Sequence, residues 1–332
     1  MLITRTPFRI SFFGGGTDYP VWYRKHGGAV LSSSINKYCY ITVRHLPPLF
    51  SYKYRIRYTN QEEAMSLADI KHPSVRECLN YLNFADTPIE MQHNADLPAM
   101  IGLGSSSSFT VGFLHALHAL SGKTVSKQQL AEQAIHIEQE RVKENVGSQD
   151  QVAAAFGGLN KIEFGKDGKI MVSSIPISQQ KIDRLSSHCM MIYTGQSRIA
   201  SDIAAEQIKN TPNKDKELSA MREMVDESIK MLTSKQDRFK DFGTLLNESW
   251  QLKRTLSSRI TNPIIDRMYE DALRVGAYGG KLLGAGGGGF LLLVASPEIQ
   301  QKIKERFKEF VFIPFAFENS GTQVVYASGQ EV

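Results

Sequence analysis

The chain has 332 residues, which is long for a single hydrophobic core and favours two domains. Hydrophobic residues make up 42% of the sequence and charged residues 22%, as in ordinary globular proteins, and no apolar run approaches the roughly 20 residues of a membrane-spanning helix. The net charge of +5 is too small to indicate a nucleic-acid-binding protein, but it is compatible with an enzyme that handles anionic substrates.

The cysteines indicate a reducing compartment. Cys39, Cys78 and Cys189 are an odd number, lie far apart and form no CxxC pair. This pattern predicts buried, reduced thiols in a cytoplasmic protein, not disulfides or a zinc site. The first ten residues have strand-like sequence and show no features of a secretory signal peptide.

The first part of the chain predicts a strand at residues 3–13 that ends at a glycine triplet. Thr17 or Asp18 then caps a short helix with Pro20 in its first turn. Alternating apolar residues or helical spacing predict the next elements, which are strands at 29–34, 38–45, 53–58 and 89–93 and a helix at 74–82.

The run Ile101 to Ser108 (IGLGSSSS) precedes an apolar helix predicted at residues 109–120. Its two glycines allow a close approach of the backbone to a ligand, and the start of a helix offers unpaired N–H groups and a positive dipole end. With four hydroxyls facing the same point, this combination predicts a site for a polyphosphate and its metal ion. The lysine of the GxxxxGK[ST] loop is missing, and a serine-rich linker remains an alternative.

The next helix begins at a capping box formed by Ser126 and Gln129. At 100° per residue, Glu138 falls within the apolar stripe of this helix. An inward-facing carboxylate is costly unless a cation receives it, so Glu138 is either a metal ligand or part of an internal salt bridge. Asp150, farther along, is a candidate helix cap or a site residue.

The composition changes near residues 177–185, where we place the domain boundary. Asn262 and Gly276 mark the start and end of a helix, and a glycine-rich run at 279–289 leads directly into a strand. Ordering so many glycines has a high cost in conformational entropy, which predicts that the backbone of this run lies close to a ligand or to another loop. The alternative is a simple hairpin connection. The second half is therefore predicted to be an α+β domain with helices on one antiparallel sheet, built from strands at 189–193, 290–295, 311–315 and 323–326 and helices at 199–258, 263–276 and from 296.

Three glycine-rich segments, in this order and spacing, resemble the motifs of the galactokinase, homoserine kinase, mevalonate kinase and phosphomevalonate kinase (GHMP) superfamily. The matching segments are Thr6 to Tyr19, Gly102 to Ser108 and Lys281 to Gly289. The resemblance implies an α+β fold with a ribosomal-protein-like βαβ domain at residues 1–180 and a ferredoxin-like domain at residues 181–332. It also implies a small-molecule kinase that uses ATP and Mg²⁺.

Within this superfamily, the chain is most similar to the branch that phosphorylates heptose 7-phosphate at its anomeric C1 hydroxyl, on the route to nucleotide-activated heptose. Segments 5–23, 36–40, 193–198 and 261–263 carry this similarity. Galactokinases have Glu-His where this chain has Gly15 and Gly16, which argues against galactose as the acceptor.

The resemblance also implies roles for individual residues. Asp150 and Arg9 are expected at the reacting groups, and Ser106 and Glu138 are expected to bind Mg²⁺. The remaining positions are the ATP-phosphate loop (Gly102, Leu103, Gly104, Ser105, Ser106, Ser107), the sugar site (Gly15, Gly16, Asp18, Asp150) and the third-motif loop (Gly284, Gly286, Gly287, Gly288). Cations are expected at a phosphate carried by the acceptor, and the candidates are Arg198, Lys253 and Arg24.

Alternatives remain at two levels. Arg9 is otherwise a surface charge at a strand end, and Asp18 a helix cap. The function is otherwise that of an anomeric kinase for another sugar, such as fucose or an N-acetylhexosamine, or of a catalytically silent sugar sensor. The expected partners are ATP and a phosphorylated sugar, without nucleic acid or membrane, in a monomer or a homodimer.

Overall fold

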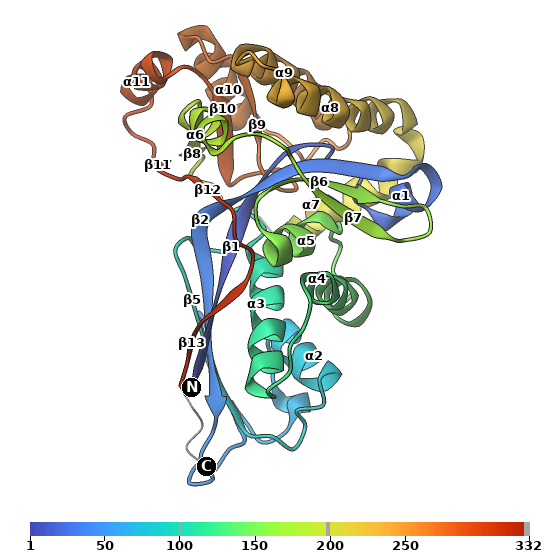
Figure 1. The fold of residues 1–332 in the computed structure, drawn as a ribbon, viewed down its shortest axis with the longest axis vertical. Coiled ribbons are helices and arrows are strands. Elements are labelled where there is room, and N and C mark those ends of the chain that lie inside the picture. The colour runs from blue at the N-terminus through green and yellow to red at the C-terminus, as the bar shows by residue number, and fades with distance from the viewer. Residues whose placement is uncertain (100, 197–199, 329–332) are drawn as a thin grey trace.

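The computed structural model describes residues 1–99, 101–196 and 200–328. Figure 1 shows an elongated molecule, with a long sheet and its helices in the lower part and a helix-rich domain in the upper part. Within the described residues, the larger sheet has nine strands: β1 (Leu2–Phe13), β2 (Gly28–His45), β3 (Tyr54–Arg57), β4 (Gln61–Ala64), β5 (Ile89–Ala95), β6 (Leu159–Phe164), β7 (Ile170–Ser174), β12 (Phe317–Glu318) and β13 (Gln323–Ala327).

Strand β2 is continuous, whereas the sequence predicted separate strands at 29–34 and 38–45. Pro7 of β1 lies opposite Tyr38 and Phe8 lies opposite Ile35, so β2 carries extra residues in a bulge at this point. A bulge bends a strand without ending it, which a pattern of apolar residues does not reveal. Asn36, in the bulge, donates its N–H to the carbonyl of Ala316 at 2.9 Å.

Helix α3 (Ser105–Leu120) packs against β1 and β2 and forms the spine of the first domain. Gly112 makes this packing possible, because a Cβ there would lie 2.6 Å from the hydroxyl of Thr6. The carbonyl of Gly112 accepts a hydrogen bond of 2.9 Å from the Thr4 hydroxyl. The other helical segments of this domain are α1 (Pro20–His26), η1 (Leu67–Asp69), α2 (Pro73–Tyr81), α4 (Lys127–His136), η2 (Ile137–Arg141) and α5 (Gln149–Phe156).

The predicted capping box of Ser126 and Gln129 is present at the start of α4. The helix then changes to the single π-helical turn η2, which carries Glu138. Short π-helical segments within helices often occur at functional sites.

The second domain contains an antiparallel sheet of order β11-β8-β10-β9, and helix α9 packs against it. The predicted helix from Pro263 is present, with the Asn262 side chain capping its start and Gly276 (φ +118°) ending it. The elements are β8 (Cys189–Tyr193), β9 (Gly279–Leu282), β10 (Phe290–Val294), β11 (Phe312–Ile313), α6 (Gln179–Ser187), α7 (Ala200–Asn210), η3 (Thr211–Asn213), α8 (Asp215–Thr233), α9 (Phe239–Arg254), α10 (Pro263–Val275) and α11 (Pro297–Arg306).

The strand predicted at 323–326 exists, but the prediction placed it in the second domain. Strand β13 instead pairs with β1, and β12 pairs with β2. Figure 1 shows this segment running back alongside the first strand. The two-domain α+β architecture is confirmed, and the limits at residues 180 and 181 stay a prediction.

The three cysteines are buried free thiols, as predicted. Among the residues that the structure describes, none of the helices combines the length and apolar character needed to cross a bilayer.

Candidate functional site

Arg9 and Asp150, 141 positions apart in sequence, form a bidentate ion pair. The Arg9 guanidinium donates from Nε to Oδ1 of Asp150 at 2.8 Å and from Nη2 to Oδ2 at 2.6 Å, and Nη1 donates to the carbonyl of Gly102 at 2.7 Å. Arg9 is only 4% exposed, so it is not the strand-end surface charge of the alternative interpretation. The pair therefore links β1, the first turn of α5 and the glycine loop before α3.

The glycine loop adopts left-handed backbone conformations that favour glycine, with φ of +82° at Gly102 and +74° at Gly104. A Cβ at Gly104 would lie 3.2 Å from a carboxylate oxygen of Asp150, so the loop lies directly against the ion pair. Leu103 is buried, and its carbonyl accepts the N–H of Arg9 at 3.1 Å. The loop ends at the start of α3, where unpaired N–H groups attract anions.

The four serines do not face one point, contrary to the prediction. Ser105 is half-buried and Ser106 is exposed. Ser107 donates its hydroxyl to Glu138 at 2.8 Å, and Ser108 donates to the carbonyl of Pro7 at 2.9 Å. Consecutive helical residues point about 100° apart, so four of them spread around the axis. The exposed side chain of Ser106 faces outward, while that of Ser107 supports Glu138.

Glu138 is completely buried, as the helical-wheel argument predicted. Its Oε2 accepts hydrogen bonds from Ser107 and Gln151, while Oε1 has no partner among the described residues. Burial raises the pKa of Glu138 to about 7. A buried carboxylate oxygen without a hydrogen-bond partner is a hard donor of the kind that Mg²⁺ prefers. Glu138 therefore fits the ion, whereas Ser106 as the second ligand stays a prediction.

Asp18 is also buried, and it is not a helix cap, because α1 starts after Tyr19 without a side-chain cap. Its Oδ1 accepts the N–H of Gly16 at 2.9 Å, and its Oδ2 accepts the Gln149 side chain at 3.0 Å. Burial is the main reason that the pKa of Asp18 is raised, and the Asp150 charge adds to the effect. Gly147, which sequence reasoning missed, leaves room for this carboxylate, because a Cβ there would lie 1.9 Å from it.

Two buried lysines surround the same carboxylates. Lys253 of α9 donates from Nζ to the carbonyl of Gly284 at 2.5 Å, and burial together with the Arg9 charge lowers its pKa to about 8. Lys281 of β9 donates to the carbonyl of Phe12 at 2.9 Å, and burial with the Lys253 charge lowers its pKa strongly. Lys281 lay within the third motif, but sequence reasoning gave it no role. With Arg9, these lysines surround the carboxylates with basic side chains, which favours an anionic ligand.

The third-motif loop lies against the glycine loop. A Cβ at Gly284 would lie 2.4 Å from the Cα of Gly102, and one at Gly288 would lie 2.6 Å from the carbonyl of Gln196. Farther along, the N–H of Gly287 donates to the carbonyl of Ile260 at 2.8 Å, and Gly286 also lies against Ile260. Of the two predicted purposes of this run, the structure shows the close approach to another loop.

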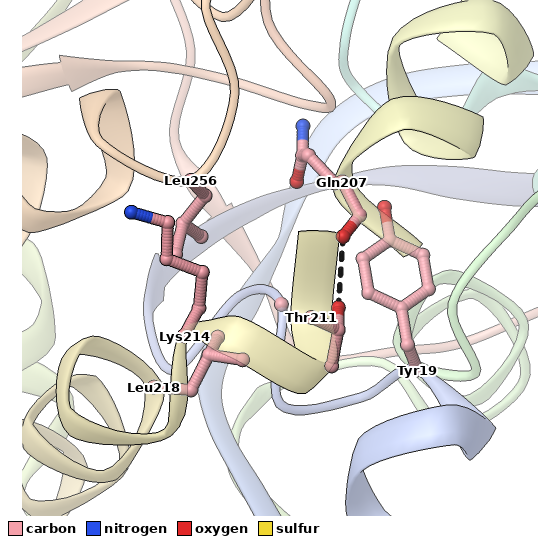
Figure 2. Close-up of a pocket in the computed structure, with 7 residues that line it drawn as sticks. Tyr19, Gln207, Thr211, Lys214, Leu218 and Leu256 are labelled. Atoms are coloured by element: carbon pink, nitrogen blue, oxygen red, sulfur yellow. Dashed lines mark hydrogen bonds between the residues drawn. The ribbon is translucent and has the colours of Figure 1, made fainter. Parts of the chain in front are cut away.

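The candidate cations for an acceptor phosphate lie in different places. Lys253 is buried near Arg9, Arg24 is exposed on the last turn of α1, and Arg198 lies outside the described residues. Sequence reasoning missed another cation, Lys214, which lines a pocket with Tyr19 (Figure 2). No local motif marks Lys214, because it reaches the site only through the packing of the two domains.

Comparison with known proteins defines the class of this protein. The model of the GHMP kinases N terminal domain matches residues 73–158, and the GHMP kinases C terminal model matches residues 231–312. The chain is an ATP-dependent kinase that transfers a phosphoryl group to an alcohol.

Individual relatives agree with this assignment. The chain is 31% identical to the D-glycero-alpha-D-manno-heptose 7-phosphate kinase of Campylobacter jejuni, over 96% of this chain and 97% of that protein. It therefore belongs to the GHMP kinases.

Solved structures share the fold at lower identity. A D-glycero-D-manno-heptose 1-phosphate kinase from Bacteroides thetaiotaomicron has a TM-score of 0.82 at 21% identity, covering 99% of this chain and 100% of that one. Streptococcus pneumoniae phosphomevalonate kinase, in complex with phosphomevalonate and AMPPNP, has a TM-score of 0.76 at 17% identity, covering 96% and 100%.

Proposed function

We propose that this kinase phosphorylates the anomeric C1 hydroxyl of D-glycero-D-manno-heptose 7-phosphate with ATP and Mg²⁺, giving the 1,7-bisphosphate. The observation that carries the proposal is the buried Arg9–Asp150 pair, held against Gly102 at the start of α3. The acceptor is inferred from the relative that is 31% identical and is named a heptose 7-phosphate kinase.

The nucleotide end of the site is the turn at the start of α3. Its free N–H groups and the hydroxyls of Ser105 and Ser106 would bind the ATP phosphates. Glu138 and Ser106 would hold Mg²⁺, which neutralises phosphate charge during the transfer. Glu138 must lose its proton to do so, and a pKa of about 7 makes this possible near neutral pH.

At the acceptor end, both oxygens of Asp150 bind Arg9, and each still has a free lone pair. Asp150 therefore accepts a hydrogen bond from the C1 hydroxyl. This bond orients the C1 oxygen toward the γ-phosphorus of ATP. The C1 oxygen forms the new bond to phosphorus as the bond to ADP breaks, and the hydroxyl proton leaves toward Asp150. Arg9 and Lys253 supply the positive charge that stabilises the transferring group.

Asp18 is influenced by the charge of Asp150 and already accepts hydrogen bonds from Gly16 and Gln149. It is placed to receive hydrogen bonds from sugar hydroxyls, with Gly15 and Gly16 leaving space for the ring. The three free cysteines support a reducing compartment, and we place the enzyme in the cytoplasm.

The test is ADP release with Mg-ATP and a panel of sugars. Heptose 7-phosphate should be turned over far better than unphosphorylated heptose, fucose or an N-acetylhexosamine. Better turnover of a free sugar would favour the alternative acceptors. Product analysis by ³¹P NMR should show the new phosphate on C1.

A silent sugar sensor is the other candidate function. Intact Arg9, Glu138 and Asp150 in contact with their partners weigh against it. The Asp150→Asn variant separates the two, because a kinase loses turnover while still binding nucleotide.

A further inference from the structure

A small pocket lies at Gly16 and Tyr19, next to the acceptor end of the proposed site. Figure 2 shows its wall, built from the Tyr19 ring, the end of α7 with η3, and the start of α8. The lining residues are Gly16, Tyr19, Gln207, Thr211, Lys214, Leu218 and Leu256, around about 190 Å³ of empty space. Much of this space is open to solvent, so the pocket is a shallow hollow and not an enclosed ligand cavity.

The pocket shares two walls with the proposed sugar site. The N–H of Gly16 binds the carboxylate of Asp18 at 2.9 Å, and Gly16 also lines the pocket. Tyr19 follows Asp18 directly, and its ring also lines the pocket. The charges of Asp18, Asp150 and Arg9 act on the Tyr19 hydroxyl. A sugar with its C1 at Asp150 would extend along these residues into the pocket.

Lys214 supplies positive charge to this pocket. Its side chain is 25% exposed, and its ammonium lies 3.2 Å from Glu217, one turn along α8. Partly exposed ion pairs of this kind contribute at most about 1 kcal/mol to stability. Lys214 can therefore leave Glu217 and bind an anionic ligand. Lys214 is also the N-cap of α8, a helix of 19 residues whose dipole adds positive potential at this end.

The other lining groups are less suited to an anion. Gln207 uses its side-chain amide to donate to the carbonyl of Ala285, and the hydroxyl of Thr211 donates to the carbonyl of Gln207 (Figure 2). Leu218 and Leu256 close the floor, where a Cβ at Gly16 would lie 3.1 Å and 3.5 Å from them. The pocket therefore combines an apolar floor, formed by Leu218 and Leu256, with the ammonium group of Lys214.

We propose that this pocket binds the phosphorylated end of the acceptor and that Lys214 is the cation that selects a sugar phosphate over a free sugar. The inference rests on the proposed function. In heptose 7-phosphate, the phosphate lies at the end of the molecule opposite C1, which matches a pocket at the far side of the Asp18 site. Lys253, by contrast, binds Gly284 and lies near Arg9, so it belongs to the transferring phosphoryl group.

The test is steady-state kinetics of Lys214→Met with two acceptors, heptose 7-phosphate and the unphosphorylated heptose. Loss of a charge-assisted contact should raise KM for heptose 7-phosphate roughly 10- to 100-fold. KM for ATP and for the unphosphorylated heptose should stay within about twofold. Lys216→Met is the matched control, because it removes the same charge from an exposed position in the same turn.

Equal effects of Lys214→Met on both acceptors, or an effect of Lys216→Met of the same size, would overturn the inference and leave the proposed function standing. A second measurement covers the case in which wild-type protein does not phosphorylate heptose 7-phosphate. Calorimetric titration with ribitol 5-phosphate, which has no anomeric hydroxyl, measures binding of a phosphorylated polyol without phosphoryl transfer. Tighter binding to wild type than to Lys214→Met would support the pocket as a phosphate site and reject heptose 7-phosphate as the acceptor. Equal binding to the two proteins would reject the pocket as a phosphate site.

Discussion

Replacing Glu138 with glutamine keeps the shape of the side chain and removes its ionisation. In the wild-type protein, burial raises the pKa of Glu138 to about 7 from the usual 4.5. The folded state therefore holds this proton more tightly than the unfolded state. The resulting stability is fully present below pH 4.5 and is lost as the pH rises to 7 and above.

The magnitude follows from that difference. About 2.5 pH units at 1.36 kcal/mol each give roughly 3 kcal/mol of stability lost by the metal-free wild type above pH 7. In Glu138→Gln, the new side chain would still accept from Ser107 and Gln151, but its amide N–H groups would replace the unpartnered Oε1 and cost about 1–3 kcal/mol at every pH. The variant should therefore be less stable than wild type at pH 5 and as stable or more stable at pH 8.

The assay is urea unfolding in EDTA between pH 5 and 8.5, followed by the same series with Mg²⁺ and a non-hydrolysable ATP analogue. Mg²⁺ with nucleotide should restore wild-type stability at pH 8 but not at pH 5, and it should stabilise Glu138→Gln less than wild type. Parallel pH profiles for the two proteins in EDTA would refute the reasoning, because they would show that Glu138 ionises normally.

The remaining predictions concern the reacting groups and the loop contact. Asp150→Asn should lower kcat about 1,000-fold or more in an ADP-release assay, with nucleotide affinity by calorimetry nearly unchanged; a loss of both would point to misfolding instead. Lys253→Met should lower kcat/KM about 100-fold while the urea midpoint at pH 7 stays level or rises, because a buried charge is removed; a falling midpoint contradicts this. Gly284→Ala should destabilise the protein by about 1–3 kcal/mol more than Gly168→Ala, since both have positive φ but only Gly284 lies against Gly102. Equal losses would show that backbone strain alone is responsible.

Sequence reasoning succeeded where the physical cause is local. The inward orientation of Glu138 followed from helical spacing, and the caps at Ser126, Asn262 and Gly276 followed from residue types next to each helix. The loop before α3 was also marked by its glycines. The role of each residue, in contrast, came from resemblance to a family and remains a proposal.

Sequence reasoning failed where position depends on tertiary packing. The cluster of serines was predicted to face one ligand, but the helix turns Ser107 toward Glu138 and Ser108 toward the backbone of Pro7. Lys214 approaches Tyr19 only because α8 packs over the first domain, and spacing in the sequence contains no trace of that contact. Likewise, the composition of β13 predicts a strand but not the partner with which it pairs.

The pairing of β13 with β1 has a consequence for how the protein is made. Strand β1 leaves the ribosome early, whereas β12 and β13 emerge only after the whole helical domain. During synthesis, β1 therefore keeps one bare edge, and Phe12 lacks the ring of Phe317 that packs against it in the finished protein. A nascent chain stalled before residue 317 would expose that edge to neighbouring polypeptides, so premature termination should yield aggregates instead of a usable half-enzyme.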